Sequence, residues 1–317
     1  MIVTVTPNPS IDRTLNVPAI RRGEVIRATA TTSEAGGKGI NVSRALSLMG
    51  VPTVAVAPAS AATKARLDDL LDGSAPLRTV PIAGDIRVNM SLVEPDGTVT
   101  KVNEPGAAVD ATDAARLLED VVAAVLEILG DDRDESNWIV CCGSLPPGLP
   151  DGFYAAIAAR APASVRVAVD ADRAALRAAV SARVALLKPN RVELEELVGR
   201  RLPTLGDVVD AAAELVAGGT EMVLVSLGSD GALFVDRTGA CHAEAAIDDV
   251  ANTVGAGDAL LAGFLAGGAT ATALPTAIAW SVAACRAPGT RMPPVAAADL
   301  AAVVVRPTVD RDRQLEG

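Results

Sequence analysis

Aromatic and histidine side chains are scarce in this 317-residue sequence: aromatic residues make up 2% of it, and His242 is the only histidine. One histidine in a segment of small residues argues against Ser-His-Asp hydrolysis and against a histidine-based metal site. The shortage of aromatic rings removes the stacking platforms of proteins that bind single-stranded nucleic acids. His242 is expected to be structural.

Runs of Lys and Arg and paired cysteine motifs are missing as well. The net charge is −11, and nucleic-acid phosphates require clustered cations, so no nucleic-acid partner is predicted. No CxxC pair occurs, and the neighbours Cys141 and Cys142 would point to opposite faces of a strand. The N-terminus resembles no secretory signal, so a reduced, cytoplasmic protein is predicted.

One long stretch, residues 259–285, lacks charge and could in principle cross a bilayer. Gly267, Gly268 and Pro275 interrupt its middle, and alanine supplies much of the rest. Two buried helices joined by a turn explain this pattern better than a membrane span. No membrane association is predicted.

The chain contains short β-branched runs that alternate with Ala- and Leu-rich segments. The predicted strands span 2–6, 53–57, 137–142, 165–169, 184–188 and 221–226, and the predicted helices span 40–49, 111–129, 152–160, 172–180 and 207–217. Such alternation predicts an α/β fold with an open, mostly parallel sheet and helices on both faces. Ligands of such sheets bind beyond the carboxyl ends of the strands.

Two segments, 12–34 and 86–104, alternate polar and apolar residues without helical spacing. The second contains a hairpin-type turn at 94–97. We expect both to form a small antiparallel sheet, a lid, inserted in a single domain that spans 1–317. The Asp- and Arg-rich end, 309–317, is expected to be frayed.

The sequence Gly255-Ala256-Gly257-Asp258 places three small residues and one carboxylate before an uncharged helix-like stretch. At a helix start, unpaired N–H groups and the helix dipole attract an anion, and small side chains let it approach. A simple turn capped by an acidic residue explains the same four residues equally well. Asp258 is therefore a candidate base or a simple helix-start residue.

A second glycine-rich stretch, 36–39, surrounds Lys38 and precedes a helix. It is no Walker loop, because Thr32 and Gly39 stand where that motif needs Gly and Ser or Thr. Its backbone donors and lysine could still bind a phosphate or a sugar hydroxyl, and a flexible loop is the alternative. Asp12, which follows two prolines, could accept two hydroxyls of a polyol or belong to a turn.

Three further stretches have both a structural and a functional interpretation. Asn190 and Glu193 share one helical face, where they suit a hydrated Mg²⁺ or a helix start. Residues 225–233 read as a hairpin or as a wall of a nucleotide pocket. Arg87 and Lys101, in the lid, could bind a phosphate that the substrate already carries.

These stretches together resemble the PfkB branch of the ribokinase family of sugar kinases, over nearly the whole chain. The matching motifs are T-x-N-P-x-x-D at 6–12, G-G-K-G with Asn41 at 36–41, R-x-N at 87–89, N-E-P-G at 103–106, G-S-L-P-P-G at 143–148, N-x-x-E at 190–193 and the segment 253–258. Within the family the chain is most similar to the subgroup of 1-phosphofructokinases and tagatose-6-phosphate kinases.

The resemblance implies a three-layer α/β/α domain with a β lid that forms a homodimer contact. It also implies phosphorylation of fructose 1-phosphate at its 6-hydroxyl, with ATP, Mg²⁺ and, in some members, K⁺. At the reacting centre the resemblance implies that Asp258 is the base and that the N–H groups of Gly255, Ala256 and Gly257 form an anion hole. For the acceptor it implies sugar binding by Asp12, Gly37, Asn41 and Asn89 and phosphate binding by Lys38, Arg87 and Lys101. For the nucleotide it implies Mg²⁺ binding through water by Asn190 and Glu193 and an ATP pocket from Asn190, Ser226, Gly228, Gly231 and Thr253.

Three places depart from the family pattern: 58–62, Ile86 and 283–292, the last with Cys285, Arg286 and Pro288. They put substrate fit, nucleotide preference and a K⁺ site in question. Tagatose 6-phosphate and fructose 6-phosphate remain alternative acceptors. A sugar-phosphate-binding regulator is the non-enzyme alternative, and a dinucleotide-dependent oxidoreductase would need a GxGxxG that is missing after the first strand.

Overall fold

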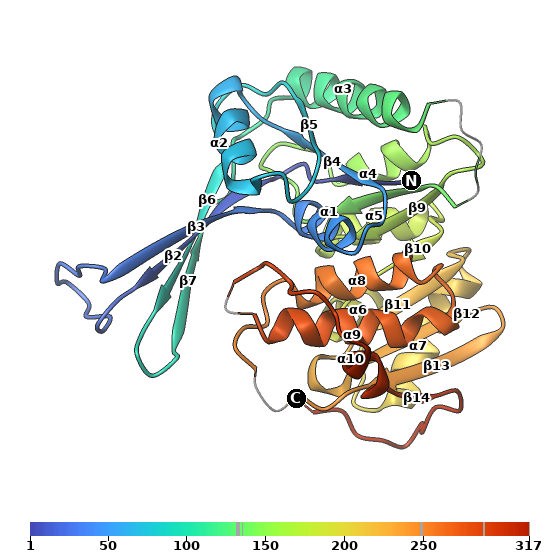
Figure 1. Cartoon of the computed structure of the whole chain (residues 1–317). Coiled ribbons are helices and arrows are strands. Elements are labelled where there is room, and N and C mark those ends of the chain that lie inside the picture. Colours follow the sequence, from blue (N-terminus) through green and yellow to red (C-terminus); the bar gives the residue numbers. More distant parts are fainter. Residues whose placement is uncertain (131–133, 135, 248–249, 288, 317) are drawn as a thin grey trace.

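The computed structural model describes residues 1–130, 134, 136–247, 250–287 and 289–316 (Figure 1). Its large sheet has ten strands in the order β14-β13-β12-β11-β10-β9-β8-β1-β4-β5, parallel from β5 to β11 and antiparallel beyond. The strands are β1 Ile2–Val5, β4 Thr53–Pro58, β5 Leu77–Val80, β8 Trp138–Cys142, β9 Arg166–Asp170, β10 Leu186–Leu187, β11 Met222–Ser226, β12 Ala232–Asp236, β13 Gly239–Glu244 and β14 Val304–Arg306.

Helices cover both faces of this sheet, as the strand–helix alternation predicted. One face carries α1 Lys38–Leu48, α2 Ala61–Leu71, α8 Ala256–Ala266 and α9 Leu274–Cys285, and the other carries α3 Ala111–Leu129, α4 Phe153–Ala158, α5 Arg173–Ser181, α6 Arg191–Val198 and α7 Leu205–Ala217. The short helix α10, Ala297–Ala301, packs on α9. The three-layer α/β/α prediction is confirmed.

Neighbouring side chains on the central strands enter different cores. Cys141 and Cys142 are adjacent in β8, yet Cys141 packs under α3–α5 and Cys142 packs under α1 and α8. All four cysteines are buried and free. This is the expected consequence of a period of two in a strand that is covered on both faces.

The uncharged stretch forms two packed helices, α8 and α9, joined by a turn and the short 3-10 helix η2 (Ala271–Ala273). Phe264 and Trp280 are almost fully buried against the large sheet. The prediction of two buried helices is confirmed. In the described part of the chain, no helix is long and apolar enough to cross a membrane.

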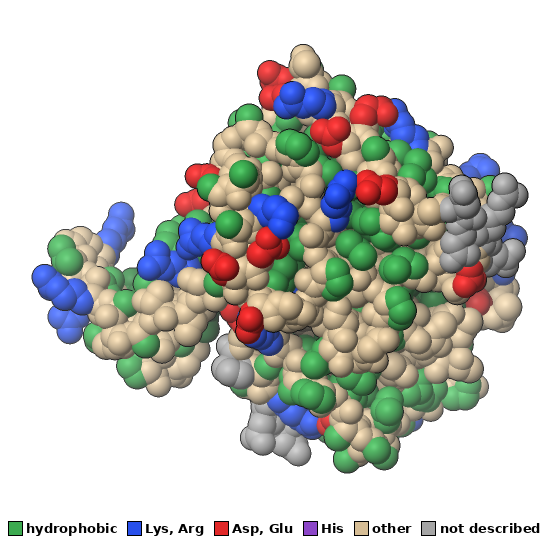
Figure 2. Space-filling model, turned by 45° about the horizontal axis from the view of Figure 1, so that its top comes forward, with side chains coloured by type: hydrophobic (Ala, Val, Ile, Leu, Met, Phe, Trp, Pro, Cys, Tyr) green, Lys and Arg blue, Asp and Glu red, His purple; other side chains and the backbone are tan. Residues whose placement is uncertain are grey.

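A second sheet projects from the body as a long arm (Figure 1). Its strands are β2 Ser10–Asn16, β3 Ala30–Gly36, β6 Arg87–Val93 and β7 Val99–Asn103, in the order β3-β2-β6-β7. The prediction of an antiparallel sheet is partly wrong, because β2 and β6 pair in parallel. Both strands run outward from the body, and β3 and β7 return. Figure 2 shows Lys and Arg side chains on this arm, whereas both charge signs mix over the body.

The expectation of a frayed end is wrong for residues 309–316; Gly317 lies outside the described residues. The amides of Leu205 and Gly206 donate to the carbonyl oxygens of Arg313 and Arg311 at 3.0 and 2.9 Å. Leu315 packs, partly buried, against the core beside α7. The charges that suggested a solvated end instead find carboxylate partners across the surface, among them Asp210.

Candidate active site

One cavity of about 310 Å³ lies beyond the carboxyl ends of the central strands. Parallel strands end at the same edge of a sheet, so Asp170, Lys188 and Ser226 meet there from β9, β10 and β11. The starts of α1, α6 and α8 and the inner ends of β2 and β6 complete the wall. The lining residues are Ser10, Asp12, Gly37, Lys38, Asn41, Arg87, Asn89, Asp170, Lys188, Asn190, Glu193, Ser226, Val254, Gly255, Gly257 and Asp258.

The start of α8 combines a glycine turn with a buried carboxylate. Gly255, at the N-cap, has φ 83°, and Asp258 is 7% exposed in the first turn. Asn41 Nδ2 donates to Asp258 Oδ2 at 2.9 Å. Burial first, and the negative charge of Asp170 second, raise the pKa of Asp258 to about 6. A carboxyl group with such a pKa can accept a proton near neutral pH.

Two lysines share the buried carboxylate of Asp170. Lys38 Nζ donates to Asp170 Oδ1 at 2.8 Å, and Lys188 Nζ lies 2.9 Å from Oδ2. Burial alone would lower the pKa of Lys38, but Asp170 and Asp172 raise it, so Lys38 is charged. A Cβ added to Gly257 would lie 3.5 Å from Lys188 Nζ. Positive charge therefore stands directly beside the backbone of the α8 turn.

The arm supplies a hydrogen-bonded wall on the other side of the cavity. Ser10 Oγ and Asn89 Nδ2 both donate to Asp12 Oδ1, at 2.7 and 3.0 Å. A Cβ on Gly36 would lie 2.4 Å from Asp12 Cγ, so only glycine lets the carboxylate take this position. Arg87, at the start of β6, adds a half-buried guanidinium whose Nε has no hydrogen-bond partner among the described residues.

Asn190 and Glu193 form a capping box at the start of α6. Glu193 N donates to Asn190 Oδ1 at 2.9 Å, and Asn190 N donates to Glu193 Oε2 at 2.8 Å. Burial raises the pKa of Glu193. In the described ranges no three His, Cys, Asp or Glu side chains are grouped to hold a metal ion. The residues fit a Mg²⁺ that keeps its waters, because amide and carboxylate oxygens face the same cavity as the lysines.

Several predicted site residues do not line this cavity. Lys101 is exposed on β7, opposite Ser91. Thr253 is exposed before α8, and Ala256 is the first residue of that helix. Gly228 and Gly231, not lining residues either, flank the turn after β11, which forms the predicted hairpin with β12.

Sequence reasoning missed Asp170, Lys188 and Ser10. Asp170 directly follows the predicted strand 165–169, and Lys188 is the last residue of the predicted strand 184–188. A charged side chain at the carboxyl end of a buried strand is the signal that could have identified both residues. Ser10 lies inside the first motif. Its hydroxyl contacts the substrate-binding candidate Asp12, which no spacing rule reveals.

The described residues of the three departures from the family pattern do not line this cavity. In 58–62, Ser60 caps α2 by accepting a hydrogen bond from Thr63 N. Ile86 packs against the core beside α2. In 283–292, Arg286 pairs with Asp299 at 2.6 Å, whereas Pro288 lies outside the described residues.

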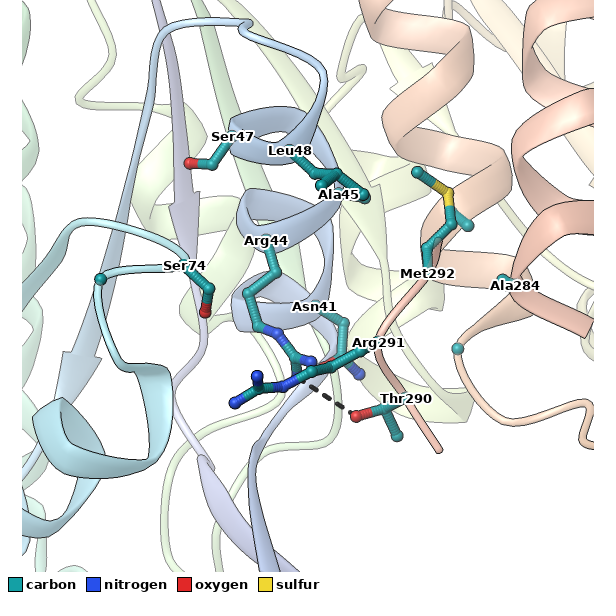
Figure 3. A pocket seen from close by; sticks show the side chains of 13 residues that line it. Asn41, Arg44, Ala45, Ser47, Leu48, Ser74, Ala284, Thr290, Arg291 and Met292 are labelled. Carbon is teal, nitrogen blue, oxygen red and sulfur yellow. Dashed lines mark hydrogen bonds between the residues drawn. The ribbon is translucent and has the colours of Figure 1, made fainter. Parts of the chain in front are cut away.

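A second cavity, of about 340 Å³, lies along α1 (Figure 3). Asn41 and Gly255 line both cavities. Arg44 and Arg291 extend into this one, and Glu34 Oε1 lies 3.9 and 3.8 Å from their nearest nitrogens. A carboxylate of the chain therefore already occupies the place between the two guanidinium groups.

Comparisons with known proteins agree with the motifs. A profile of pfkB family carbohydrate kinases matches residues 5–291. The 1-phosphofructokinase of Rhodobacter capsulatus is 37% identical over 273 residues, which cover 83% of this chain and 82% of that protein. The 1-phosphofructokinase of Escherichia coli K12 is 35% identical over 269 residues, which cover 84% of this chain and 83% of that protein. A crystal structure of phosphofructokinase-2 from Escherichia coli in complex with potassium has a TM-score of 0.84 and 33% identity, covering 95% of this chain and 96% of that one. The profile match includes every residue that lines the first cavity.

Proposed function

The chain belongs to the PfkB family of carbohydrate kinases, and on that premise we propose that it transfers the terminal phosphoryl group of MgATP to the 6-hydroxyl of fructose 1-phosphate. The observation that carries the proposal is the position of Asp258. This buried carboxylate faces one cavity that also holds cations for two phosphates.

In the proposed reaction Asp258 accepts the proton of the attacking hydroxyl, and Asn41 holds its carboxylate in place. An alcohol is a far weaker acid than a carboxylic acid, so the proton leaves late, as the new phosphorus–oxygen bond forms. Catalysis of phosphoryl transfer is mostly positioning and charge stabilisation.

Backbone N–H groups of Gly255 and Gly257 provide that stabilisation at the start of α8, where the helix dipole adds positive potential. The N–H of Ala256, which was also predicted for this role, donates to the carbonyl oxygen of Thr253 at 3.3 Å. Lys188, beside Gly257, supplies a full positive charge at the same place. When bound, Mg²⁺ neutralises charge on the nucleotide phosphates, and Asn190 and Glu193 would hold its waters.

Recognition of the acceptor is assigned to the arm and to α1. Asp12, held by Ser10 and Asn89, would accept sugar hydroxyls. Lys38 and Arg87 would bind the phosphate that the sugar carries, because both are cations that line the cavity. Closing the arm over the cavity would exclude water and prevent hydrolysis of ATP.

Three finer statements are also proposals. The Escherichia coli phosphofructokinase-2 structure is a complex with potassium, and on that likeness we propose that this chain also binds K⁺. Four free, buried cysteines fit a reducing compartment, and we place the protein in the cytoplasm. A homodimer through the arm would cover the apolar face made by Val88, Met90 and Leu92.

The experiment that tests the function is ADP release with MgATP and, in parallel, fructose 1-phosphate, fructose 6-phosphate, tagatose 6-phosphate and fructose. We expect a strong preference for fructose 1-phosphate. Preference for either 6-phosphate would keep the mechanism and change the acceptor. No ADP release with any acceptor, from folded protein, would contradict the proposal and favour a sugar-phosphate-binding regulator.

A further inference from the structure

The C-terminal segment, residues 310–316, contacts the turn that begins two residues after the cavity-lining Ser226 and that the family resemblance assigns to the nucleotide pocket. This turn is the 3-10 helix η1, Gly228–Asp230, between β11 and β12. Asp230 is 3% exposed, and the segment binds both of its carboxylate oxygens. Arg313 Nη2 donates to Oδ1 at 2.9 Å, and Glu316 N donates to Oδ2 at 2.8 Å. A buried carboxylate is costly unless it is paired, so these contacts fix the turn and the segment together.

Glu316 connects η1 to a second element of the proposed site. Its Oε2 accepts a hydrogen bond from Ser229 Oγ at 2.9 Å, and its carbonyl oxygen accepts one from Arg191 Nη1, also at 2.9 Å. Arg191 is the first residue of α6, directly after Asn190. One residue of the segment thus contacts both the turn and the helix start that we assign to the nucleotide and its metal.

Backbone hydrogen bonds close the turn, with Leu227 N donating to Gly231 O at 2.8 Å, and the buried His242 Nε2 lies 2.7 Å from Asp230 O. The outer residues of the turn have less support. Gly228 and Gly231 have φ values of 64° and 83°, and a Cβ on Gly231 would lie 2.2 Å from the carbonyl oxygen of Ala243. Gly228 and Ser229 are exposed. Segments with few buried contacts open more readily than the core. The contacts that the C-terminal segment makes with Ser229 and Asp230 therefore add to the internal hydrogen bonds and hold the outer part of the turn.

Backbone hydrogen bonds hold the segment independently of its side chains. Leu205 N donates to Arg313 O at 3.0 Å, Gly206 N to Arg311 O at 2.9 Å, and Leu315 N to Pro203 O at 2.9 Å. The segment is thereby attached to the start of α7 on one side, and its side chains extend to η1 on the other. A side-chain substitution can then change the turn without detaching the segment.

We propose that residues 310–316 form a C-terminal strap that holds η1 and the start of α6 in the conformation that binds the adenosine part of an adenine nucleotide. Arg313 and Glu316 are its positioning residues. The inference rests on the proposed function, and it adds that a segment more than 50 residues beyond Asp258 sets nucleotide affinity without contacting the sugar phosphate.

The test compares Arg313→Ala, Glu316→Gln and Ser229→Ala with the wild type. For Arg313→Ala we expect KM for MgATP to rise about tenfold, equivalent to about 1.4 kcal/mol, because Asp230 loses its cation. KM for fructose 1-phosphate should stay within about twofold in all three. Arg311→Ala is the matched control: it removes an ion pair from the same segment, to Asp210, and should leave both constants unchanged.

Three outcomes in steady-state kinetics would contradict the strap. An equal rise of both KM values in Arg313→Ala, or the same rise of KM for MgATP in Arg311→Ala, would mean that the structure has loosened in general. The third is an unchanged KM for MgATP in both Arg313→Ala and Ser229→Ala. Thermal denaturation checks that each variant is folded. Ser229→Ala removes only an exposed hydroxyl, so the Ser229→Ala variant keeps the test valid if Arg313→Ala unfolds.

Calorimetric titration of ADP without sugar separates the strap from the proposed function. Weaker ADP binding by Arg313→Ala supports the strap whichever sugar phosphate is the acceptor. Unchanged ADP binding by the variants overturns the strap alone. A wild type that binds no ADP overturns the proposed nucleotide site, and the strap with it.

Discussion

In the proposed reaction Asp258 is buried beside the reacting groups and must be ionised in order to accept a proton. Replacing it by asparagine keeps the shape and the contact with Asn41 but removes the proposed base. We expect Asp258→Asn to lower kcat about 10³-fold, while the Kd for ATP changes little. Steady-state kinetics and calorimetry measure the two quantities. Near-normal turnover would remove Asp258 from the role of base.

The pKa of Asp258, raised to about 6 by burial and by Asp170, predicts a pH dependence. The ionised form is the active one, so kcat/KM should be constant above pH 6 and fall tenfold per pH unit below it. The folded protein holds this proton over a pH range in which the unfolded chain has lost it, so stability falls as pH rises from about 4 to 6. A pH–rate profile without an inflection between pH 5 and 7 would contradict the assignment.

Arg87 and Lys101 were predicted to act together, and the structure separates them. Arg87 lines the cavity, whereas Lys101 is exposed opposite Ser91, four residues farther along β6 and so about 13 Å away. We expect Arg87→Ala to raise KM for the sugar phosphate at least about tenfold and KM for ATP far less. Lys101→Ala is the control and should change either constant less than about twofold. Equal effects of the two substitutions would contradict this division.

At the scale of elements, Asn190 and Glu193 cap the start of α6, and the proposed function gives the same two side chains the role of holding Mg²⁺ through water. Glu193→Gln keeps an oxygen that can accept from Asn190 N but removes the negative charge. We therefore expect an unchanged Tm and a higher Mg²⁺ concentration for half-maximal activity. Thermal denaturation and a Mg²⁺ titration check this. A large loss of Tm with unchanged Mg²⁺ dependence would leave only the capping role.

The positions of the helices and strands agree closely with those that the local sequence pattern predicted. The helix predicted over 111–129 is α3, where Asp110 caps the first turn and Leu117, Val121 and Val125 recur on the buried face. The strand pairing in the arm was harder to predict, because β2 and β6 pair in parallel and their paired residues are about 77 apart in sequence. No local rule specifies such a partner.

At the scale of the whole molecule, the arm exposes an apolar face. Met90 pairs with Val102 across β6 and β7, and Val102 is 48% exposed. We expect Met90→Asp to shift the protein from dimer to monomer, as measured by sedimentation, because a buried unpaired charge opposes association. Leu126→Asp, on the exposed side of α3, is the control and should leave the dimer intact. A wild-type monomer would contradict the proposed arm contact.

The sequence by itself determined the α/β alternation, the two buried helices of the uncharged stretch and the motifs that carry Asp258, Lys38 and Asn190. These depend on periodicity and on the order of residues, which local physics and family resemblance reveal. Only the tertiary structure decided that Asp170 joins Lys38 to Lys188, that Lys101 lies outside the cavity and that Arg313 is bound to Asp230. These contacts bridge distant segments, and the long-range packing that brings the segments together leaves no periodic trace in the sequence.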